Sequence, residues 1–181
     1  IYHFSPLEAR EVGKLCARHR ATIVLSTPTF LRGYWRRCNA TDFEHVDVLV
    51  TGAERLPVEL ADAVEEKFGI RPIEGYGTTE LSPLSAVNIP PSRARGNPGE
   101  GVREGTIGRP IPCVDAKIVH REHFEDLPPD SEGMLLFRGP NVMKGYLNDP
   151  EKTFEVMRGE WYVTGDIAKI DADGFIRITG R

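Results

Sequence analysis

The first half of the chain alternates short apolar runs with longer segments in which apolar residues recur every three to four positions. The short runs have the length of buried strands, and the longer segments have the period of amphipathic helices. Such alternation predicts βα units and a parallel sheet. We expect strands at 21–25, at 46–50 and in the run that enters Tyr76, and helices after Ser5, at 30–37 and at 57–68.

The first of these helices has a specific predicted start. Ser5 is expected to be the N-cap, with Pro6 at the first helical position. Glu8, three residues after Ser5, would close a capping box. The helix is therefore predicted to begin directly after Ser5.

From about residue 92 the pattern changes. Residues 92–105 are rich in glycine and charge, which predicts a loop or junction. The short apolar runs that follow are separated by turn signals, as in a small barrel or sandwich. Strands are expected at 114–119, 134–137, 167–170 and 175–178, with one short helix around 150–157 and a hairpin turn at 171–174. We therefore divide the chain into an α/β subdomain, residues 1–91, and a barrel-like β subdomain, residues 92–181.

Composition narrows the classes of protein that need to be considered. The chain has 181 residues, 40% of them hydrophobic and 28% charged, which is typical of a globular protein with a sizeable core. A net charge of −4 argues against nucleic-acid binding. No apolar run approaches the roughly 18 residues of a membrane span, and no signal-like start is present. We expect a cytoplasmic protein, with membrane contact only through parts of a longer parent protein.

The three cysteines, Cys16, Cys38 and Cys113, are odd in number and lack a C-x-x-C pattern. This arrangement favours unpaired thiols in a reducing compartment over a disulfide framework.

The chemically most informative residues lie in Glu74-Gly-Tyr-Gly-Thr-Thr-Glu80 and in Trp161-Tyr-Val-Thr-Gly-Asp166. Tyr76 offers a flat face to a base, while Gly77, Thr78 and Thr79 offer backbone and hydroxyl groups to phosphate oxygens. Glu80 is a hard oxygen ligand suited to Mg²⁺. Asp166 can accept hydrogen bonds from both hydroxyls of a ribose. Together the two segments indicate ATP.

Each of these residues also has a structural interpretation. Tyr76 can be a core aromatic at a strand end, Glu80 an acid at a helix start, and Asp166 the cap of a turn. The Arg32, Arg36 and Arg37 cluster, with Tyr34 and Trp35, is interpreted as a solvated helix face with a buried tryptophan, and contact with a carrier protein or nucleic acid is the alternative. His120 and His123 lack a third metal ligand nearby, and the glycines of 99–105 do not have the dinucleotide-binding spacing.

The two segments resemble the Y-G-x-T-E and T-G-D signatures of the adenylate-forming superfamily, which includes acyl-CoA synthetases, acyl-carrier-protein synthetases and peptide-synthetase adenylation domains. Further stretches are similar to the family's pattern in the same order. They are Thr51-Gly-Ala-Glu54, Gly105-Thr-Ile-Gly-Arg-Pro110, Gly133-Met-Leu-Leu-Phe-Arg-Gly139 with Gly145-Tyr-Leu147, and Asp171 through Arg181.

The resemblance implies an α/β fold in which this chain is part of the family's large N-terminal domain, with parallel βα units followed by a distorted β-barrel. The chain opens at Ile1-Tyr-His-Phe4 in mid-pattern and stops at Arg181. The family's phosphate-binding loop, and the small domain that carries its catalytic Lys, have no match here. We therefore expect a fragment that is inactive by itself.

The resemblance also implies roles for the site residues. Glu80 would hold Mg²⁺ and Thr79 would donate to the α-phosphate of ATP, which makes these two the candidate catalytic residues. The other residues would bind the nucleotide as ATP or AMP: Gly52, Ala53 and Glu54 beside the adenine, Tyr76 stacked on it, Gly77 and Thr78 near the phosphates, Asp166 and Arg181 at the ribose, and Ile178 near sugar and base.

The substrate is expected to be a fatty acid, because residues 81–90 are apolar and no lone charge is placed to pair with an amino acid. The stretches V-N-I-P-P and G-P-N-V-M-K-G-Y-L-N most resemble the acyl-carrier-protein synthetase part of bifunctional enzymes that also carry an acyltransferase and recycle phospholipids. Acyl-carrier protein is thus the preferred thiol acceptor and coenzyme A the alternative. A module that binds a nucleotide or a partner without turnover is the alternative from another class.

Overall fold

The computed structural model describes residues 3–94 and 97–181. Ile1 and Tyr2, in the predicted mid-pattern start, and two residues of the predicted 92–105 loop lie outside the described residues. Two units can be distinguished, the first made of 1–74 and 89–105 and the second of 75–88 and 106–181. This division differs from a boundary at residue 91, because residues 75–87 pair with one another and with a strand that follows residue 105.

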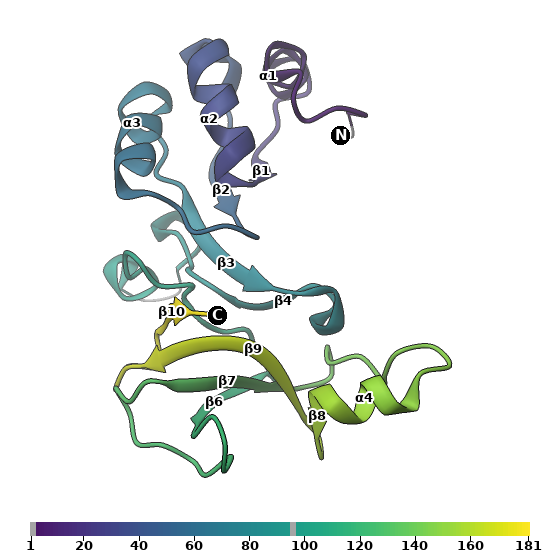
Figure 1. The fold of residues 1–181 in the computed structure, drawn as a ribbon. Helices are drawn as coiled ribbons and strands as arrows, with labels where there is room; N and C mark the ends of the chain where they lie inside the picture. Colours follow the sequence, from purple (N-terminus) through teal and green to yellow (C-terminus); the bar gives the residue numbers. More distant parts are fainter. Residues whose placement is uncertain (1–2, 95–96) are drawn as a thin grey trace. The chain divides into compact units, whose positions relative to one another are not determined.

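The first unit contains the predicted βα units, so the expected α/β class is confirmed. Its strands run parallel: Ile23 to Ser26 pair with Val48 to Thr51, and Val50 and Thr51 pair with Ile73 and Glu74. In Figure 1 the three helices of this unit lie side by side near β1 and β2. Its elements are α1 (Ala9–Arg18), β1 (Ile23–Ser26), α2 (Pro28–Arg37), η1 (Ala40–Phe43), β2 (Val48–Thr51), α3 (Val58–Phe68), the start of β3 (Ile73–Gly77), η3 (Pro91–Arg93) and η4 (Pro98–Glu100).

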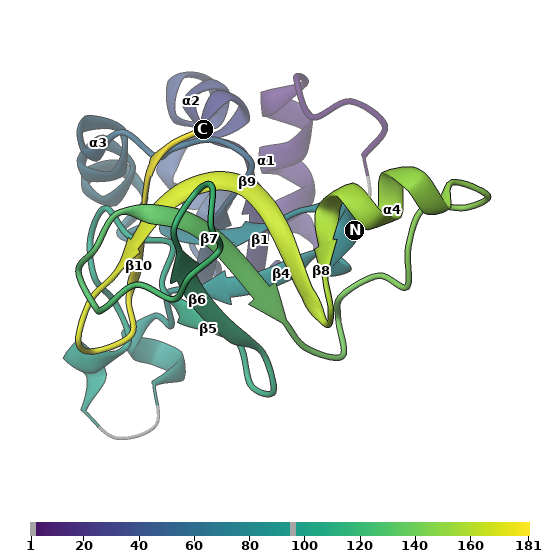
Figure 2. The ribbon, with the colours of Figure 1, turned by 60° about the horizontal axis from the view of Figure 1, so that its bottom comes forward.

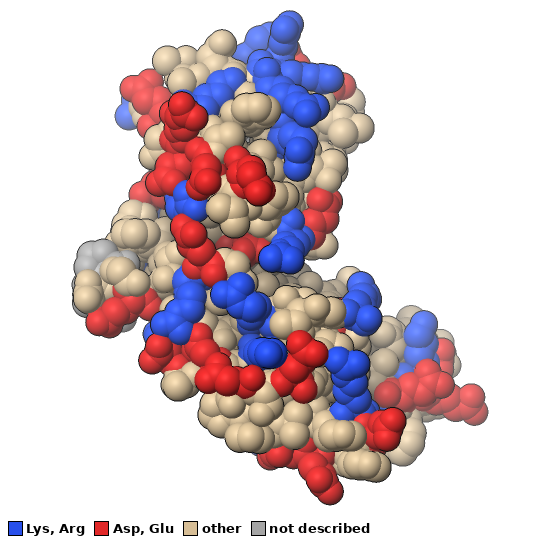
Figure 3. Space-filling model, turned by 60° about the vertical axis from the view of Figure 1, so that its left-hand side comes forward, with Lys and Arg blue, Asp and Glu red and all other residues tan. Residues whose placement is uncertain are grey.

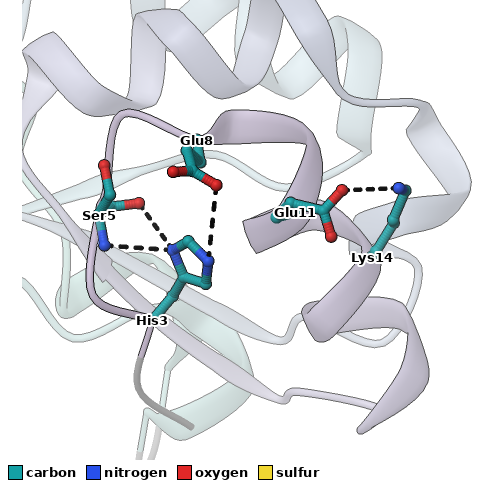
Figure 4. A network of polar contacts seen from close by, with 5 residues as sticks. All are labelled: His3, Ser5, Glu8, Glu11 and Lys14. Atoms are coloured by element: carbon teal, nitrogen blue, oxygen red, sulfur yellow. Dashed lines mark hydrogen bonds and ion pairs between the residues drawn. The ribbon is translucent and has the colours of Figure 1, made fainter.

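The predicted start of the first helix is wrong. Helix α1 begins at Ala9, with Glu8 as an N-cap residue that makes no side-chain capping bond. Figure 4 shows that the His3 ring lies against the Ser5 backbone, with Nδ1 2.8 Å from the Ser5 carbonyl oxygen and 3.2 Å from the Ser5 amide nitrogen. The same ring approaches the Glu8 carboxylate at 3.8 Å. The Ser5 amide and the Glu8 carboxylate, which a capping box would join to each other, therefore lie against His3 instead.

The prediction that 21–25 is a buried strand is only half right. Strand β1 forms, but its residues alternate, with Val24 8% exposed and Ile23 and Leu25 55% and 75% exposed. Successive side chains of a strand point to opposite faces. The described residues cover only the Val24 face, so a wholly apolar run does not give a wholly buried strand here.

The core of the first unit is built from the inner faces of its helices. Thr27 caps α2 by accepting a bond from the Phe30 amide, and Pro28 follows at the first turn. The buried aromatic rings of Phe43 and Phe68 lie 4.6 Å apart. Contacts of this kind, with Leu31 and Val64 fully buried beside them, account for most of a helix's stability in a protein.

The basic cluster predicted on the second helix is a solvated face in the structure. Arg32, Arg36 and Arg37 are exposed, whereas Tyr34 is buried at 4% exposure and Trp35 is partly buried. The buried aromatic is thus Tyr34 and not the tryptophan expected there. Figure 3 shows Lys and Arg side chains gathered near the top of the view, the end at which the helices of this unit lie in Figure 1.

The three cysteines are free, as predicted. Cys16 and Cys38 are buried, and burial raises the pKa of both thiols, that of Cys38 to about 11. Cys113 is exposed. We expect iodoacetamide to label Cys113 in the native parent protein, and to label Cys16 and Cys38 only after denaturation, because the thiolate is the reactive form and needs access to solvent. Mass spectrometry of the labelled peptides gives the answer, and native labelling of Cys38 would contradict the described packing.

The second unit is a β structure with one helix. The end of β3 pairs antiparallel with β4 (Leu84–Val87), and β4 pairs with β5 (Arg109–Pro110). A second sheet has the order β10-β9-β7-β6, with β8 paired to β9. Figure 2 shows β9 as a long, strongly bent strand beside β7 and β6, consistent with the expected distorted barrel. The elements of this sheet are β6 (Asp115–Val119), β7 (Gly133–Arg138), β8 (Met157–Arg158), β9 (Trp161–Ile170) and β10 (Ile176–Gly180), with α4 (Pro150–Val156) before β8.

The predicted hairpin turn at 171–174 is confirmed. Strands β9 and β10 pair antiparallel on either side of it, with Ile170 opposite Ile176. The Asp171 carboxylate accepts bonds from the Asp173 and Phe175 amides at 3.0 and 2.9 Å. The Asp171 side chain thus stabilises the turn. Among the described residues, no helix is long and apolar enough to cross a membrane.

Gly77, where β3 ends, is a position in the second unit that leaves no room for a side chain. A Cβ atom placed there would overlap the carbonyl group of Pro83 on the returning chain. We expect Gly77→Ala to lower the free energy of unfolding of the parent protein by at least about 2 kcal/mol, since overpacking forces the backbone to move. Chemical denaturation measures the change.

Gly33, inside α2, is the matched control, because a Cβ there meets nothing within 4 Å. Gly33→Ala should leave stability unchanged or raise it by up to about 1 kcal/mol, the helix-propensity difference between the two residues. Equal stability of the Gly77→Ala variant and the wild-type protein would show that β3 and β4 do not approach as closely as described.

Candidate nucleotide site

The segment with the densest candidate chemistry turns sharply at the end of β3. After Gly77 the chain enters the 3₁₀ turn η2 (Thr79–Leu81) and returns as β4. The Asn141 side chain holds this return, because its Nδ2 atom lies 2.9 Å from the Leu81 carbonyl oxygen, 3.0 Å from that of Leu84 and 2.9 Å from the Ser85 hydroxyl. The turn therefore presents Thr79, which is exposed, and Glu80, which is partly buried, on a fixed backbone.

Tyr76 and Asp166 meet in the second unit although 90 positions separate them. The Tyr76 hydroxyl donates to Asp166 Oδ2 at 2.5 Å, and the Tyr76 ring stacks on that of Phe137 with centroids 5.7 Å apart. Burial, and then the bond to Asp166, raise the pKa of Tyr76 well above its ordinary value. The tyrosine is therefore neutral at physiological pH and acts as a donor to the carboxylate.

Asp166 is fixed from its backbone as well as through its carboxylate. Its amide donates to the Thr164 hydroxyl at 3.0 Å, and that buried hydroxyl donates to the Leu135 carbonyl oxygen at 2.8 Å. Gly165 between them has φ +78°, a left-handed conformation that favours glycine. The Asp166 side chain is 14% exposed, and Arg181 approaches Oδ1 with Nε at 3.6 Å. A carboxylate held in this way can offer its remaining lone pairs to two neighbouring hydroxyls.

Glu80 has a hydroxyl partner of its own, Tyr146. The Tyr146 hydroxyl donates to Glu80 Oε1 at 2.7 Å. This bond is the main cause that lowers the pKa of Glu80, and it raises the pKa of Tyr146 to about 12. Glu80 is thus a charged carboxylate at neutral pH, which is the form that binds a hard divalent cation.

Two further hydroxyls lie close to the Glu80 carboxylate. Tyr162 is buried, and burial raises its pKa. The Thr78 hydroxyl oxygen is buried beside Glu80 and Tyr162, but its geometry there does not make a regular hydrogen bond. Buried polar atoms normally have partners, and an exception in a native structure is typical of a place that a ligand or ion completes.

The residues near Glu80 fit Mg²⁺ shared with a ligand better than a cation held by protein alone. Across residues 3–94 and 97–181, no group of three or more His, Cys, Asp and Glu side chains is placed to hold a metal ion. Mg²⁺ prefers six oxygen ligands and commonly takes one or two carboxylates together with phosphate oxygens and water. Glu80 supplies one such carboxylate.

The predicted site residues do not all belong to one unit. Tyr76, Gly77, Thr78, Thr79, Glu80, Asp166, Ile178 and Arg181 lie in the second unit. Ile178 pairs with Ala168 and packs partly buried against the core of that unit. Gly52, Ala53 and Glu54 lie in the first unit, directly after β2, where Ala53 has φ +67° and the Glu54 carboxylate accepts a bond from the Thr29 hydroxyl at 2.7 Å.

Tyr146, Thr164 and Asn141 were not predicted as partners of the candidate site. Each lies in a segment that we had singled out, Tyr146 in the G-Y pair, Thr164 in T-G-D and Asn141 in G-P-N. Their positions in these motifs were the available signal, but nothing in the spacing says which group each one contacts. Phe137, which stacks on Tyr76, also lies in such a segment, Gly133 to Gly139.

The fold and these two tyrosine–carboxylate pairs define an α/β chain with a candidate nucleotide site. Comparison with protein families then identifies the class: residues 2–147 match the model of the AMP-binding enzyme family, and the chain belongs to that family. The resemblance to the adenylate-forming superfamily is thereby confirmed, whereas the acyl-carrier-protein synthetase subgroup stays a prediction.

Three relatives illustrate the similarity. A long-chain-fatty-acid–CoA ligase of Bacillus subtilis is 33% identical over 180 residues, which cover 98% of this chain and 30% of the ligase. A crystal structure of ATP-bound MatB from Rhodopseudomonas palustris is 30% identical, with a TM-score of 0.80 over 98% of this chain and 33% of that one. The anthranilate CoA ligase AuaEII, solved in complex with anthranoyl-AMP, is 27% identical with a TM-score of 0.86 over 100% of this chain and 33% of that one. This chain thus spans about a third of the relatives it matches.

Proposed function

We propose that this chain forms nucleotide-binding parts of an AMP-forming acid–thiol ligase that activates a fatty acid. The observation that carries the proposal is the pair of carboxylates in the second unit, each with its own tyrosine hydroxyl: Asp166 with Tyr76, and Glu80 with Tyr146. One carboxylate suits ribose hydroxyls, and the other suits a divalent cation on the phosphates. The match to the AMP-binding enzyme family supports binding of a nucleotide by this chain.

In the proposed reaction, an oxygen of the fatty-acid carboxylate attacks the α-phosphorus of ATP, and the bond to pyrophosphate breaks. A thiol sulfur then attacks the acyl carbon of the adenylate, and the bond to AMP breaks to leave a thioester. Mg²⁺, when bound, would neutralise charge on the phosphate oxygens. Glu80 would hold the Mg²⁺ ion in place, and the exposed Thr79 would donate a hydrogen bond to the α-phosphate.

The nucleoside would be bound by the other predicted residues. Asp166 would accept bonds from the ribose hydroxyls with Arg181 beside it, while Ile178 would pack near the sugar. Tyr76 would present the ring face opposite Phe137 to the adenine. Gly77 and Thr78 would lie along the phosphates, and Gly52, Ala53 and Glu54 beside the base.

The thiol acceptor and the acid are the finer parts of the proposal. Similarity to the Bacillus subtilis long-chain ligase favours coenzyme A. The V-N-I-P-P and G-P-N-V-M-K-G-Y-L-N stretches favour acyl-carrier protein, with phospholipid recycling as the setting. A cytoplasmic location, or the cytoplasmic face of a membrane, suits either acceptor.

ATP–pyrophosphate exchange by the full-length parent tests the reaction and the acid together. We expect exchange that depends on long-chain fatty acids and exceeds that with amino acids or aromatic acids. Capture of the labelled acyl group by coenzyme A or by acyl-carrier protein then identifies the acceptor. Exchange with no acid in the panel, in a parent that still binds ATP, would favour a module that binds a nucleotide without turnover.

A further inference from the structure

Glu80 is hydrogen-bonded to one short segment of the second unit, residues 143–146. The Met143 amide donates to the Glu80 carbonyl oxygen at 2.8 Å, and the Tyr146 hydroxyl donates to Glu80 Oε1 at 2.7 Å. Both the backbone and the side chain of Glu80 are thus fixed from the same place. No other described side chain makes a hydrogen bond of regular geometry to this carboxylate.

The start of α4 in turn holds the 143–146 segment through hydrogen bonds. The Tyr146 amide donates to the Thr153 hydroxyl at 2.9 Å, and that hydroxyl donates to the Asp149 carbonyl oxygen at 2.8 Å. The Asp149 side chain caps α4 by accepting from the Lys152 amide. A continuous set of bonds therefore leads from the cap of α4 through Thr153 and Tyr146 to Glu80.

This arrangement leaves the Glu80 carboxylate able to do more than pair with a tyrosine. An ionised carboxylate has about four lone-pair sites. The Tyr146 bond occupies one of them, and the Thr78 and Tyr162 hydroxyls lie nearby. Removing the hydroxyl would leave the charge in place but let the carboxylate rotate. A catalytic group held loosely by even about 1 Å loses much of its effect.

We infer that Tyr146 is a positioning residue for adenylation, which fixes the Glu80 carboxylate in the orientation that holds a divalent cation on the nucleotide. The inference rests on the proposed role of Glu80. Tyr146 does not touch the substrate in this account and acts only through Glu80. Thr153 is the support of Tyr146, one step further from the reaction.

Tyr146→Phe in the full-length parent is the direct test, because it removes one oxygen and keeps the ring. We expect kcat for pyrophosphate exchange to fall by about 5- to 30-fold, the range for a bond to a charged group discounted for partial exposure. The KM for the fatty acid should stay within about twofold. Thr153→Val should have a smaller effect in the same direction.

Tyr34→Phe is the matched control. It removes the hydroxyl of a buried tyrosine in the first unit and should leave kcat within about twofold of wild type. A double substitution separates positioning from general damage: in a Glu80→Gln background, Tyr146→Phe should cost no more than about a further threefold, because residues that act through one another are not additive.

A binding measurement tests the inference without turnover. Binding of Mn²⁺ is measured by electron paramagnetic resonance in the presence of a non-hydrolysable ATP analogue. The Tyr146→Phe substitution should lower the affinity for Mn²⁺ by about 5- to 30-fold. Wild-type kcat and Mn²⁺ affinity in this variant would overturn the inference. Lack of exchange by the wild type, with the Mn²⁺ difference intact, would overturn the proposed reaction but keep Tyr146 as the residue that orients Glu80.

Discussion

Replacing Glu80 by glutamine in the full-length parent is expected to lower the rate of adenylation by about 100-fold or more, the cost of removing a positioned electrostatic contact. The amide keeps the size of the side chain and can still accept the Tyr146 hydrogen bond, so the substitution removes little besides the charge. The lowered pKa of Glu80 means that this charge is present at neutral pH. Pyrophosphate exchange at saturating fatty acid measures the loss.

The control for this experiment is Glu66→Gln. Glu66 is an exposed acid on α3 in the first unit, and the same chemical change there should leave exchange within about twofold of wild type. Thermal unfolding of both variants should match that of the parent. Activity of Glu80→Gln within about threefold of wild type, at unchanged stability, would show that Glu80 is a solvated acid at the start of η2.

The spacing of apolar residues and the turn-forming residues predicted most of the helices and strands correctly. Helices α2 and α3 begin and end within two residues of the predicted limits, since each has a local start signal and a clear apolar face. The strands at 46–50, 114–119 and 134–137 also form, with shifted ends. These elements depend mainly on neighbours a few positions away in sequence, which a pattern can represent.

The wrong or incomplete predictions depend on contacts that a helix or strand pattern does not represent. The expected capping box at Ser5 does not form, and the Ser5 amide instead donates to the ring of His3. Strand β9 begins at Trp161, six residues before the predicted strand at 167, because its first residues pair with β8 and β7 through a register shift. Asp166, for which a turn cap was the structural interpretation, is a strand residue in the structure.

In the candidate site, too, the sequence pattern predicted some features and not others. The motifs supplied Tyr76, Glu80 and Asp166 because each carries a side chain with specific chemistry. Their partners could not be predicted: Tyr146 lies 66 positions from Glu80, and Tyr76 lies 90 positions from Asp166. Pairing over such distances is set by the sheet and by the α4 segment, and no local period reports it.

The Tyr76–Asp166 pair also decides how the ribose prediction has to be tested. Asp166→Ala in the full-length parent is expected to lower the affinity for ATP by about 30- to 1,000-fold, or roughly 2–4 kcal/mol. The reason is that a carboxylate shared by two ribose hydroxyls makes charge-assisted hydrogen bonds, which water replaces only in part. The affinity for the fatty acid should change far less. Isothermal titration of each ligand measures both effects.

The substitution also leaves the Tyr76 hydroxyl without its carboxylate partner, so a second variant is needed. Tyr76→Phe removes that hydroxyl and leaves the Asp166 carboxylate, whose backbone is still held by Thr164. We expect Tyr76→Phe to lower the affinity for ATP by less than about tenfold, which is the range for one hydrogen bond. An equal loss in the two variants would mean that the tyrosine–carboxylate contact, and not a bond to the ribose, explains the effect of Asp166→Ala.

The 2′,3′-dideoxy analogue of ATP isolates the ribose contribution. It lacks the two hydroxyls, so it should bind the wild-type parent about as weakly as ATP binds Asp166→Ala, and the variant should lose little further affinity for it. Asp166 can make this contact because its amide is held by Thr164 and its side chain remains 14% exposed. If Asp166→Ala weakens ATP and the dideoxy analogue by the same factor, the carboxylate does not bind the ribose. Asp166 is then only the partner of Tyr76 and Arg181 within the second unit.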